Sequence, residues 1–465
     1  MTEMNCKLLV IGAGPGGYVC AIRAGQLGVD TIIVEKGKPG GTCLNVGCIP
    51  SKAIIHAGDE FHKMAHAKDG SAIGITSTAP KIDFGQTLTW KDGIVGRLNS
   101  GVAGLLKKAK VRQVNGTARF HDAKKVIVDS TDGEITIKAE NVVIATGSTS
   151  VELPFLPFDG TFVQSSTDLL ADPVLPKRLA VVGGGYIGLE LGTALAKLGV
   201  DVTVVEAAER ILPQYDAELT KPIADRLQAL GVTVLTSTLA QGVGEDGKSL
   251  LVKGSDDTET SVPCDKILVT VGRRPVTSGL DLDRLAVDMD GAFIKINETC
   301  ATSMRGLYAI GDVTGEPMLA HRAMAQGEMV AEIVAGEKRV WDKYCVPAVC
   351  FTDPEILTVG LSPAEAKDAG HKIKTGKFPF MANGRAMTTE REDGFVRVVA
   401  RADNHQILGV QAVGEGISEM AAVFALAIEM GACLEDIAGT IHAHPTKGEA
   451  LQEAASMGLG HALHI

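Results

Sequence analysis

Short apolar segments alternate with longer segments of helical periodicity in the first part of the chain. Residues 7–11 and 31–34 are apolar runs of strand length, and between them a glycine-rich turn opens a helical segment that reaches about residue 27. A strand, a helix and a second strand in this order predict two parallel strands joined by a crossover helix. The pattern indicates an α/β protein.

The glycine-rich turn has the spacing of a dinucleotide-binding fingerprint. Gly12, Gly14 and Gly17 follow the first strand, and Glu35 ends the second. The first glycine permits a tight turn, the second lets the backbone approach a pyrophosphate, and the third permits close packing of helix on strand. The helix N-terminus attracts phosphate, and the acid binds a ribose hydroxyl. The turn therefore predicts a dinucleotide site.

The same fingerprint occurs a second time. Gly183, Gly185 and Gly188 follow an apolar run, and Glu206 ends the next one, again 23 residues after the first glycine. The repeat predicts two dinucleotide sites, which suits an enzyme that passes electrons between two nucleotides. A carboxylate at Glu206 favours NAD, because it binds the free ribose diol and repels a 2′-phosphate. Arg210, four residues further on, weakens that inference.

Other segments complete the first two thirds of the chain. Residues 52–110 are predicted as long helices with charged faces, and residues 111–114, 126–128 and 135–137 as a small β-meander. Two buried strands, in segments 141–148 and 266–275, are each predicted to end in a small-residue turn. The first turn contains Ala145, Thr146 and Gly147, and the second contains Gly272.

The last part of the chain differs from what precedes it. From about residue 346 there are strands at 395–399 and 407–410, a helix at 417–430 and no nucleotide fingerprint. An added α+β domain of this kind is typical of an interface. Before it, a strand at 307–310 carries Asp312 near its tip, where a carboxylate can bind a sugar alcohol. An Asx turn or a helix cap is an equally good interpretation of Asp312.

Two cysteines follow the first fingerprint closely. Cys43 and Cys48 are separated by four residues, and a distorted turn at Gly47 could close them into a disulfide. Two free thiols or half of a metal site are the alternatives, and the metal site is weak because no second Cys/His pair lies nearby. Cys345 and Cys350 have the same spacing in a strand-like stretch, so we interpret them as structural. Context therefore favours a redox disulfide at Cys43 and Cys48.

A loop near the end of the chain contains further candidate groups. His442, His444 and Glu449 could form a metal site, a cap or an acid/base pair. On their own these residues favour a structural role. Beside a dithiol, however, a histidine held by a carboxylate is what thiol deprotonation requires.

Charge and composition exclude some classes of function. The net charge is −11, from 45 basic and 56 acidic residues, which disfavours partners such as nucleic acid or an anionic membrane. No apolar run approaches the ~18 residues that span a bilayer. The N-terminus resembles neither a signal nor a transit peptide, which predicts a cytoplasmic location, or an organelle matrix if a presequence is removed. Nine cysteines in a chain of 465 residues do not indicate a disulfide scaffold.

These motifs together resemble the pyridine nucleotide-disulfide oxidoreductases, most closely the dihydrolipoamide dehydrogenases. The resemblance covers essentially the whole chain: residues 12–18, 41–52, 183–190, 309–312 and 442–449. It implies two Rossmann-like dinucleotide-binding domains and a C-terminal α+β dimerisation domain. The expected boundaries are 1–149 for FAD, 150–276 for NAD, 277–345 for a central domain that completes the FAD site, and 346–465 for the interface.

The resemblance also implies roles for individual residues. Cys43 is the expected interchange thiol and Cys48 the flavin-side thiol; Lys52 and Glu190 pair near the flavin ring, and Asp312 holds the ribitol. His444, oriented by Glu449, is the expected base, and it serves the disulfide of the other chain of a homodimer. The residues expected to bind FAD and NAD are Gly12, Gly14, Gly17, Glu35, Lys52, Ala145, Thr146, Gly147, Asp312, Ala320, Gly183, Gly185, Gly188, Glu206 and Gly272.

The implied activity is oxidation of protein-bound dihydrolipoamide by NAD⁺. The implied partner is the lipoyl domain of a 2-oxo acid dehydrogenase complex, and residues 21–28 and 90–95 resemble a bacterial branched-chain subgroup. Lys447 and Gly448 depart from the family, which usually has Leu-Ser there.

A reductase resembling glutathione or mercuric reductase is the alternative enzyme. Glu206 argues against NADPH, and the absence of a C-terminal cysteine pair argues against mercuric reductase. A non-catalytic flavin-binding scaffold is a further alternative.

Overall fold

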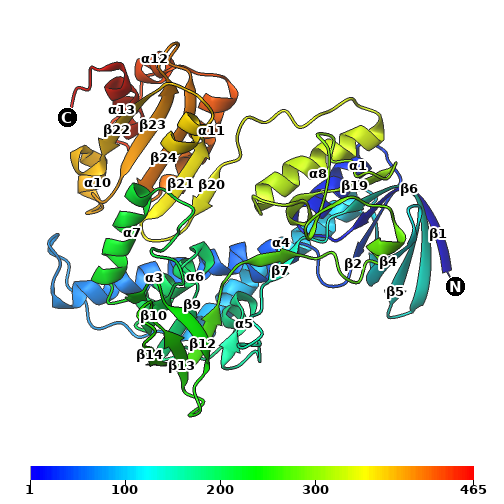
Figure 1. The fold of residues 1–465 in the computed structure, drawn as a ribbon, viewed down its shortest axis with the longest axis horizontal. Helices are drawn as coiled ribbons and strands as arrows, with labels where there is room; N and C mark the ends of the chain where they lie inside the picture. The colour runs from blue at the N-terminus through cyan, green and yellow to red at the C-terminus, as the bar shows by residue number, and fades with distance from the viewer. Residues whose placement is uncertain (1) are drawn as a thin grey trace.

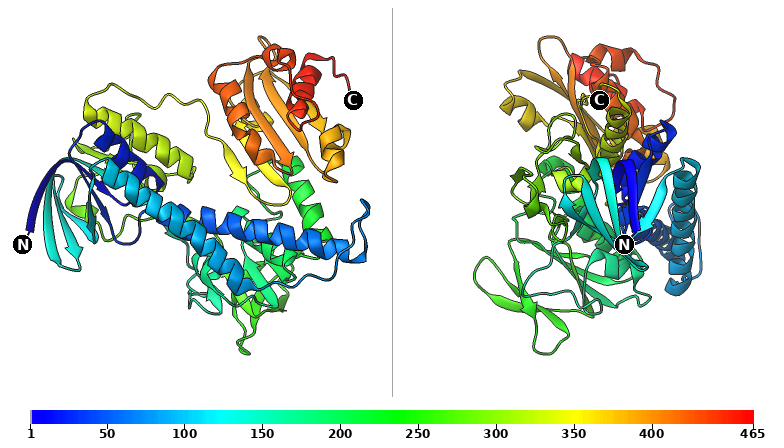
Figure 2. Two further views of the ribbon diagram at one scale, coloured as in Figure 1. Left: turned by 180° about the vertical axis from the view of Figure 1, so that it is seen from behind. Right: turned by 90° about the vertical axis from the view of Figure 1, so that its right-hand side faces the viewer.

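The computed structural model describes residues 2–465 and contains three bodies, each built on its own sheet (Figures 1 and 2). The first sheet has the order β3-β2-β1-β6-β5-β4, and β19 also pairs with β6. The central strand β1 is covered on both faces, and its residues Leu8, Leu9 and Val10 are buried between two parallel neighbours. The strands and helices are β1 (Thr2–Ile11), α1 (Pro15–Gln26), β2 (Thr31–Glu35), α2 (Gly41–Val46), α3 (Cys48–His66), α4 (Phe84–Lys108), β3 (Arg112–Asn115), β4 (Thr117–Asp122), β5 (Lys125–Ser130), β6 (Gly133–Ile144), β19 (Leu307–Ala309) and α8 (Ala320–Ala335).

The second body is a five-stranded parallel sheet with the order β11-β10-β9-β15-β8. A three-stranded antiparallel sheet, β12-β13-β14, lies beside it at the bottom of Figure 1. A two-stranded ribbon of β7 and β16 joins the places where the chain enters and leaves this body. The elements are β7 (Ser148–Ser150), β8 (Val163–Gln164), α5 (Ser166–Ala171), β9 (Arg178–Val182), α6 (Tyr186–Lys197), β10 (Asp201–Val205), α7 (Ala217–Ala229), β11 (Thr233–Leu235), β12 (Leu239–Val243), β13 (Ser249–Lys253), β14 (Glu259–Pro263), β15 (Lys266–Val269) and β16 (Arg273–Pro275). The chain then returns to the first body, where the hairpin of β17 (Met289–Asp290) and β18 (Phe293–Ile294) packs Ile294 into the core of the first sheet.

The third body is a five-stranded antiparallel sheet with the order β20-β21-β24-β23-β22. Helices pack on it, and their apolar residues share one core with the strands. The elements are β20 (Ala348–Cys350), β21 (Glu355–Gly360), α9 (Pro363–Asp368), β22 (Ile373–Pro379), α10 (Gly384–Thr388), β23 (Phe395–Arg401), β24 (Ile407–Gly414), α11 (Ala421–Glu429), α12 (Leu434–Gly439) and α13 (Glu449–Leu459). None of the helices within residues 2–465 combines the length and apolar character needed to cross a membrane.

The long helices predicted over residues 52–110 are present as α3 and α4, but the middle of this range is not helical. Helix α3 ends at His66, a single 3-10 turn (Ala67–Asp69) follows, and residues 70–83 are not helical. Gly70 and Gly74 adopt positive φ there, which interrupts a helix. Asp83 then caps α4 by accepting a hydrogen bond from the backbone N–H of Gln86 at 3.0 Å.

The predicted β-meander has different strands from those expected. The segment near residues 111–114 forms β3, which pairs in parallel with β2, and the meander consists of β4, β5 and β6. The strands predicted at 135–137 and 141–148 are one strand, β6, since it pairs with β1 from Thr2 to Ile11. Exposed Lys138 and Glu140 flank buried Ala139, so polar residues alternate within a strand instead of ending it.

A buried ion cluster joins the three bodies. Asp353, just before β21, is 8% exposed at its side chain and contacts Arg391 of the third body. Its other oxygen lies 2.7 Å from Lys197 Nζ on α6 and 3.0 Å from Arg226 Nε on α7. Lys197 also pairs with Asp59 of α3. One carboxylate therefore holds three cations that come from two different bodies.

Replacement of Asp353 by Asn should destabilise the protein substantially. Burial alone raises the pKa of Asp353, but Lys197, Arg391 and Arg226 outweigh burial and hold that pKa well below its usual range. Loss of one member of a buried ion pair costs about 3–5 kcal/mol, which urea unfolding at pH 7 would measure. A carboxylate with a lowered folded-state pKa stabilises above its unfolded-state pKa, so the difference between the proteins should shrink below about pH 4.

Asp225→Asn is the matched control on α7. Asp225 forms an exposed (i, i+4) pair with Lys221, which contributes little to stability. An equal effect of the two substitutions would contradict a special role for the buried cluster.

Candidate active site

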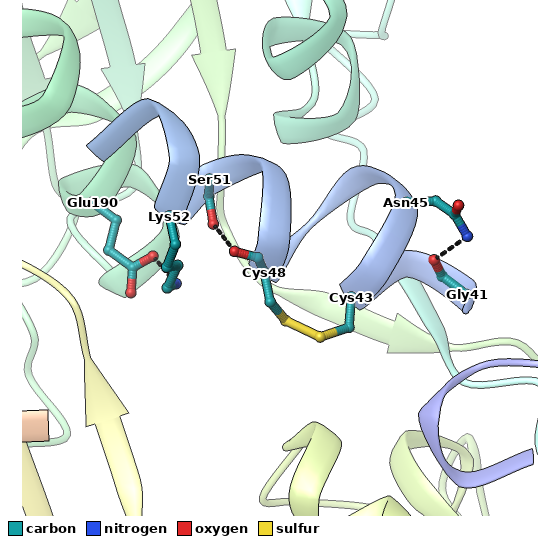
Figure 3. Close-up of a disulfide and its surroundings, with 7 residues drawn as sticks. All are labelled: Gly41, Cys43, Asn45, Cys48, Ser51, Lys52 and Glu190. Carbon is teal, nitrogen blue, oxygen red and sulfur yellow. Dashed lines mark hydrogen bonds and ion pairs between the residues drawn. A yellow bond between two sulfur atoms is a disulfide. The ribbon is translucent and has the colours of Figure 1, made fainter. Parts of the chain in front are cut away.

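Cys43 and Cys48 form a disulfide at the junction of two helices (Figure 3). Cys43 lies on α2 and Cys48 is the first residue of α3, and their Cα atoms are 4.6 Å apart. Gly47 between them has φ −138° and ψ −107°, which ends one helix and begins the next. A Cβ at Gly47 would lie 2.9 Å from the carbonyl oxygen of Thr42. The distorted turn that the sequence suggested therefore brings the sulfurs together.

The disulfide segment packs directly on the first fingerprint turn. The backbone N–H of Gly40 donates to the carbonyl of Ala13 at 2.7 Å. A Cβ on Gly41 would come within 2.5 Å of the Cα of Gly14, so the two backbones touch where only glycine fits. The side chain of Asn45 fastens α2 by donating to the carbonyl of Gly41 at 3.0 Å. The disulfide is thereby held beside the predicted dinucleotide site.

Lys52 and Glu190 meet because α3 and α6 cross at very close range. A Cβ on Gly58 of α3 would lie 2.8 Å from the carbonyl oxygen of Ala194 on α6. Glu190 lies one helical turn before Ala194, and its Oε2 is 2.7 Å from Lys52 Nζ. The other oxygen of Glu190 accepts the backbone N–H of Phe351 at 2.9 Å, and the ammonium of Lys52 lies 4.4 Å from the centre of the Phe351 ring.

The disulfide and the Lys52–Glu190 pair line one cavity of about 500 Å³. Cys43, Cys48, Lys52 and Glu190 are on its wall with Gly12, Gly14, Glu35, Ala145, Thr146, Gly147, Asp312 and Ala320. Gly17 does not line it, because its place is in the packing of α1 against the strand. Asp312 accepts a hydrogen bond from the Ser148 hydroxyl, which in turn accepts one from Arg273 Nε at 2.8 Å.

The first fingerprint has the geometry that a dinucleotide requires. A Cβ on Gly12 would lie 2.4 Å from the carbonyl of Ala145, and one on Gly17 would lie 1.9 Å from the carbonyl of Gly12. A Cβ on Gly14 would meet only the Cα of Gly41, at an ordinary 3.9 Å. Gly12 and Gly17 are therefore required by the fold, whereas the open space at Gly14 fits the close approach of a pyrophosphate.

The second fingerprint repeats the first down to its side-chain hydrogen bonds. Glu35 accepts the backbone N–H groups of Ala13 at 2.7 Å and Gly37 at 2.9 Å. Glu206 accepts those at the corresponding positions, from Gly184 at 2.6 Å and Ala208 at 2.7 Å. Both carboxylates are thus fixed at the turn by two backbone donors.

The glycines of the second copy also match those of the first. A Cβ on Gly183 would lie 2.8 Å from the carbonyl of Thr270, and one on Gly188 would lie 2.4 Å from the carbonyl of Gly183. Gly185 and Gly272 face open space. Arg210 donates to the carbonyl of Pro213 at 2.7 Å, so its guanidinium is already engaged with the backbone. The glycines of the second fingerprint and Glu206 do not line the cavity that contains the disulfide.

His444 and Glu449 are paired, but outside that cavity. The Nδ1 of His444 lies 2.8 Å from Glu449 Oε1, and the imidazole is 80% exposed. Burial alone raises the pKa of Glu449, but hydrogen bonds from the Thr446 N–H and from His444 outweigh it and lower that pKa. His442 Nδ1 lies near the carbonyl of Thr440. Within residues 2–465, no group of three or more His, Cys, Asp or Glu side chains is placed to hold a metal ion.

The other cysteines remain free, including Cys345 and Cys350. Cys350 is fully buried, and burial raises the pKa of its thiol to about 12. The interpretation of this second pair as structural agrees with these surroundings.

The sequence matches two family profiles along most of its length. Residues 6–327 match the pyridine nucleotide-disulphide oxidoreductase profile, and residues 346–455 match the dimerisation domain of the same family. The chain is 57% identical over 463 residues to a dihydrolipoyl dehydrogenase of Pseudomonas aeruginosa, with 99% of each chain covered.

The chain belongs to the pyridine nucleotide-disulphide oxidoreductase family.

Two further relatives agree with this membership. A dihydrolipoyl dehydrogenase of Geobacillus stearothermophilus is 45% identical, with 99% of this chain and 98% of the relative covered. The crystal structure of LpdA from Mycobacterium tuberculosis superposes with a TM-score of 0.89 at 26% identity, covering 98% of this chain and 99% of that one. The expected fold class is confirmed, as are FAD and NAD as the two cofactors.

Several residues of this oxidoreductase escaped the sequence analysis. Arg273 and Ser148 form the hydrogen-bonded group around Asp312, and Tyr186 lines the same cavity. Phe351 contacts the Lys52–Glu190 pair from the third body. Ser148 and Arg273 directly follow the predicted turns at residues 145–147 and 272, and this position was a signal for both. Nothing local in the sequence marks Phe351.

Gly14→Ala and Gly17→Ala should fail in different ways. The alanine at position 17 would overlap the Gly12 carbonyl, so we expect a lower melting temperature of the apoprotein as well as loss of FAD. The alanine at position 14 meets no protein atom closely, so the apoprotein should melt near the wild-type temperature while FAD binding weakens. Thermal melting with and without added FAD separates the two effects, and normal FAD affinity of Gly14→Ala would contradict a pyrophosphate at this turn.

Proposed function

We propose that this protein oxidises dihydrolipoamide to lipoamide through the Cys43–Cys48 disulfide and FAD, with NAD⁺ as the final acceptor. The observation that carries the proposal is the disulfide itself, which shares a cavity with the first fingerprint and with the Lys52–Glu190 pair. The full-length relatives at 57% and 45% identity, named dihydrolipoyl dehydrogenase, support the substrate.

The first step is thiol–disulfide exchange. His444 of a partner chain takes a proton from one thiol of dihydrolipoamide, and the resulting thiolate attacks the sulfur of Cys43. A lipoyl–Cys43 disulfide forms, the Cys43–Cys48 bond breaks, and its electron pair remains on Cys48. The second lipoyl thiol then attacks the lipoyl sulfur of the mixed disulfide, so the lipoamide ring closes and Cys43 leaves as a thiol. Two electrons have moved from the substrate to the cysteine pair.

The position of Cys48 favours its thiolate. It is the first residue of α3, which is 19 residues long, and the N-terminus of a helix attracts negative charge. Lys52, one turn further along the same helix, adds a positive charge that Glu190 and Phe351 hold in place. Bound FAD supplies the two-electron chemistry between this dithiol and NAD⁺. Asp312 would hold the ribitol of FAD, and Glu35 and Glu206 would bind ribose hydroxyls of FAD and NAD.

The active site is completed by a second copy of the chain. His444 and Glu449 belong to the third body and line no part of the disulfide cavity. The third body carries the family's dimerisation domain and exposes an apolar face on α11, with Val423, Leu426 and Met430 at 49%, 61% and 76% exposure. Such a face is typical of a surface that a partner covers. A homodimer places the exposed His444 of one chain over the disulfide of the other.

We also propose a natural substrate, a location and domain boundaries for this protein. The natural substrate is the lipoyl domain of a 2-oxo acid dehydrogenase complex, and residues 21–28 and 90–95 support the branched-chain subgroup. We propose a cytoplasmic location, and domains that end at residues 149, 276 and 345. A reductase of the glutathione type is disfavoured by the firmly held carboxylate of Glu206, which repels a 2′-phosphate.

Anaerobic titration of the flavin tests the proposal. Dihydrolipoamide should produce a long-wavelength thiolate-to-flavin band that NAD⁺ discharges and NADP⁺ does not. Cys43→Ser and Cys48→Ser should each keep FAD and lose lipoamide turnover, because each lacks the disulfide that accepts the electrons. Cys345→Ser is the matched control. Near-normal turnover in either active-site variant would remove the disulfide from the mechanism.

His444→Gln tests the base and the shared site together. Loss of a general base should lower dihydrolipoamide turnover by ~10²–10⁴-fold. A mixed dimer of Cys43→Ser and His444→Gln chains should regain one working site, because the intact disulfide of one chain meets the intact histidine of the other. Two sites each contained within one chain would leave this mixed dimer inactive, which would contradict the shared arrangement.

A further inference from the structure

The loop that carries His444 has few contacts of its own. Residues 440–448 contain no helix or strand, and Ala443, His444 and Pro445 are exposed. Within the loop, the Thr446 N–H donates to Glu449 Oε2 at 2.8 Å, and the Thr446 hydroxyl donates to the carbonyl of Ala443 at 2.7 Å. These bonds shape the loop around the His444–Glu449 pair, but they do not attach it to the sheet.

Side-chain contacts attach the loop to the third body at both ends. At its start, the amide of Gln452 on α13 donates to the carbonyl of Thr440 at 3.2 Å. Two further contacts lie close to Glu449. Asn383, a buried residue before α10, donates its amide to the carbonyl of Thr446 at 3.0 Å. Lys447 is the next residue, and its side chain is only 17% exposed. Its ammonium donates to the carbonyl of Glu415 at 2.6 Å and to the carboxylate of the same residue at 2.8 Å.

The Lys447 contact leads into the buried ion cluster. Glu415 directly follows β24, and its second oxygen lies 3.9 Å from Arg391 Nη1. Arg391 contacts Asp353, which holds Lys197 and Arg226. Glu415 therefore lies between two cations, Lys447 of the loop at 2.8 Å and Arg391 at the junction of the bodies at 3.9 Å.

We propose that Lys447 is a positioning residue for His444: anchored on Glu415, it fixes the loop so that the imidazole meets the dihydrolipoamide thiol. This inference rests on the function proposed for His444. Lys447 lies two residues before Glu449, so a displacement of its backbone moves the carboxylate that orients the imidazole. Charge-assisted hydrogen bonds to two acceptors of one residue hold an exposed loop more firmly than apolar contact does.

Lys447→Met removes the ammonium and keeps most of the chain length. We expect kcat for dihydrolipoamide to fall about 10-fold, because a base displaced by less than 1 Å loses alignment, while KM changes little. Lys447→Arg should recover most of the loss, since it restores the charge and the donors. Glu415→Gln should lower kcat less than Lys447→Met does, because the backbone carbonyl of Glu415 still accepts from Lys447. The double variant should be no worse than Lys447→Met, because both changes act on the same contact.

Lys367→Met is the matched control, since Lys367 is an exposed lysine of α9 in the same body. A kcat of Lys447→Met within about twofold of the wild type would overturn the proposal, and so would additive losses in the double variant. His444→Gln distinguishes this failure from that of the proposed function. If His444→Gln lowers turnover and Lys447→Met does not, the base stands and only the anchor is wrong; normal turnover of His444→Gln would remove the base and the anchor together.

Discussion

The contact between the disulfide segment and the first fingerprint turn determines where the chemistry of this protein takes place. Gly41 and Gly14 approach so closely that a Cβ on Gly41 would overlap Gly14, and Gly40 donates a backbone hydrogen bond to the same turn. A redox disulfide can exchange electrons with a flavin only if the two are adjacent. The local packing of two glycine-rich turns therefore fixes the sulfurs beside the turn at which we expect the pyrophosphate.

The second constraint is the crossing of α3 and α6, which belong to different bodies. Their contact at Gly58 fixes how far Lys52 and Glu190 are from each other, and hence where the positive charge lies relative to Cys48. Asp353 strengthens the same junction from the third body through Lys197 and Arg226. The cost of burying these charges is offset because each has several partners. The packing between the bodies therefore also determines where the charges beside the disulfide lie.

Much of this arrangement was predictable from the sequence, because its motifs consist of residues that are close together in the chain. Both fingerprints consist of neighbouring residues with fixed spacing, so the tight turn at Gly12 and the close packing at Gly17 follow from the sequence, and Glu35 lies at the same turn. The Cys43–Cys48 pair was also local, and its turn at Gly47 was visible. The long strand β6 was divided in two because alternating polar residues resemble a turn in the sequence, although sheet pairing with β1 decides its length.

The features that escaped prediction depend on contacts between distant segments. Phe351 touches Lys52 and Glu190 although it lies about 160 residues from Glu190, and no periodicity or motif reports such a contact. The Arg273–Ser148–Asp312 hydrogen bonds join three turns that are separated in the chain. The pairing of Lys52 with Glu190 was expected only through resemblance to the family. Spacing thus identifies the groups that react, whereas long-range packing identifies the groups that position them.

The exposure of His444 completes the argument about assembly. An imidazole that is 80% exposed and bound to a carboxylate has the hydrogen-bond geometry of a general base, yet it lines no part of the cavity that holds the disulfide. Within a single chain, the disulfide and the His444–Glu449 pair therefore lie in different places. The apolar face of α11 lies in the same body as His444, so the surface and the base that we propose are carried together. The homodimer that we propose accounts for both observations, because the histidine of one chain then serves the disulfide of the other.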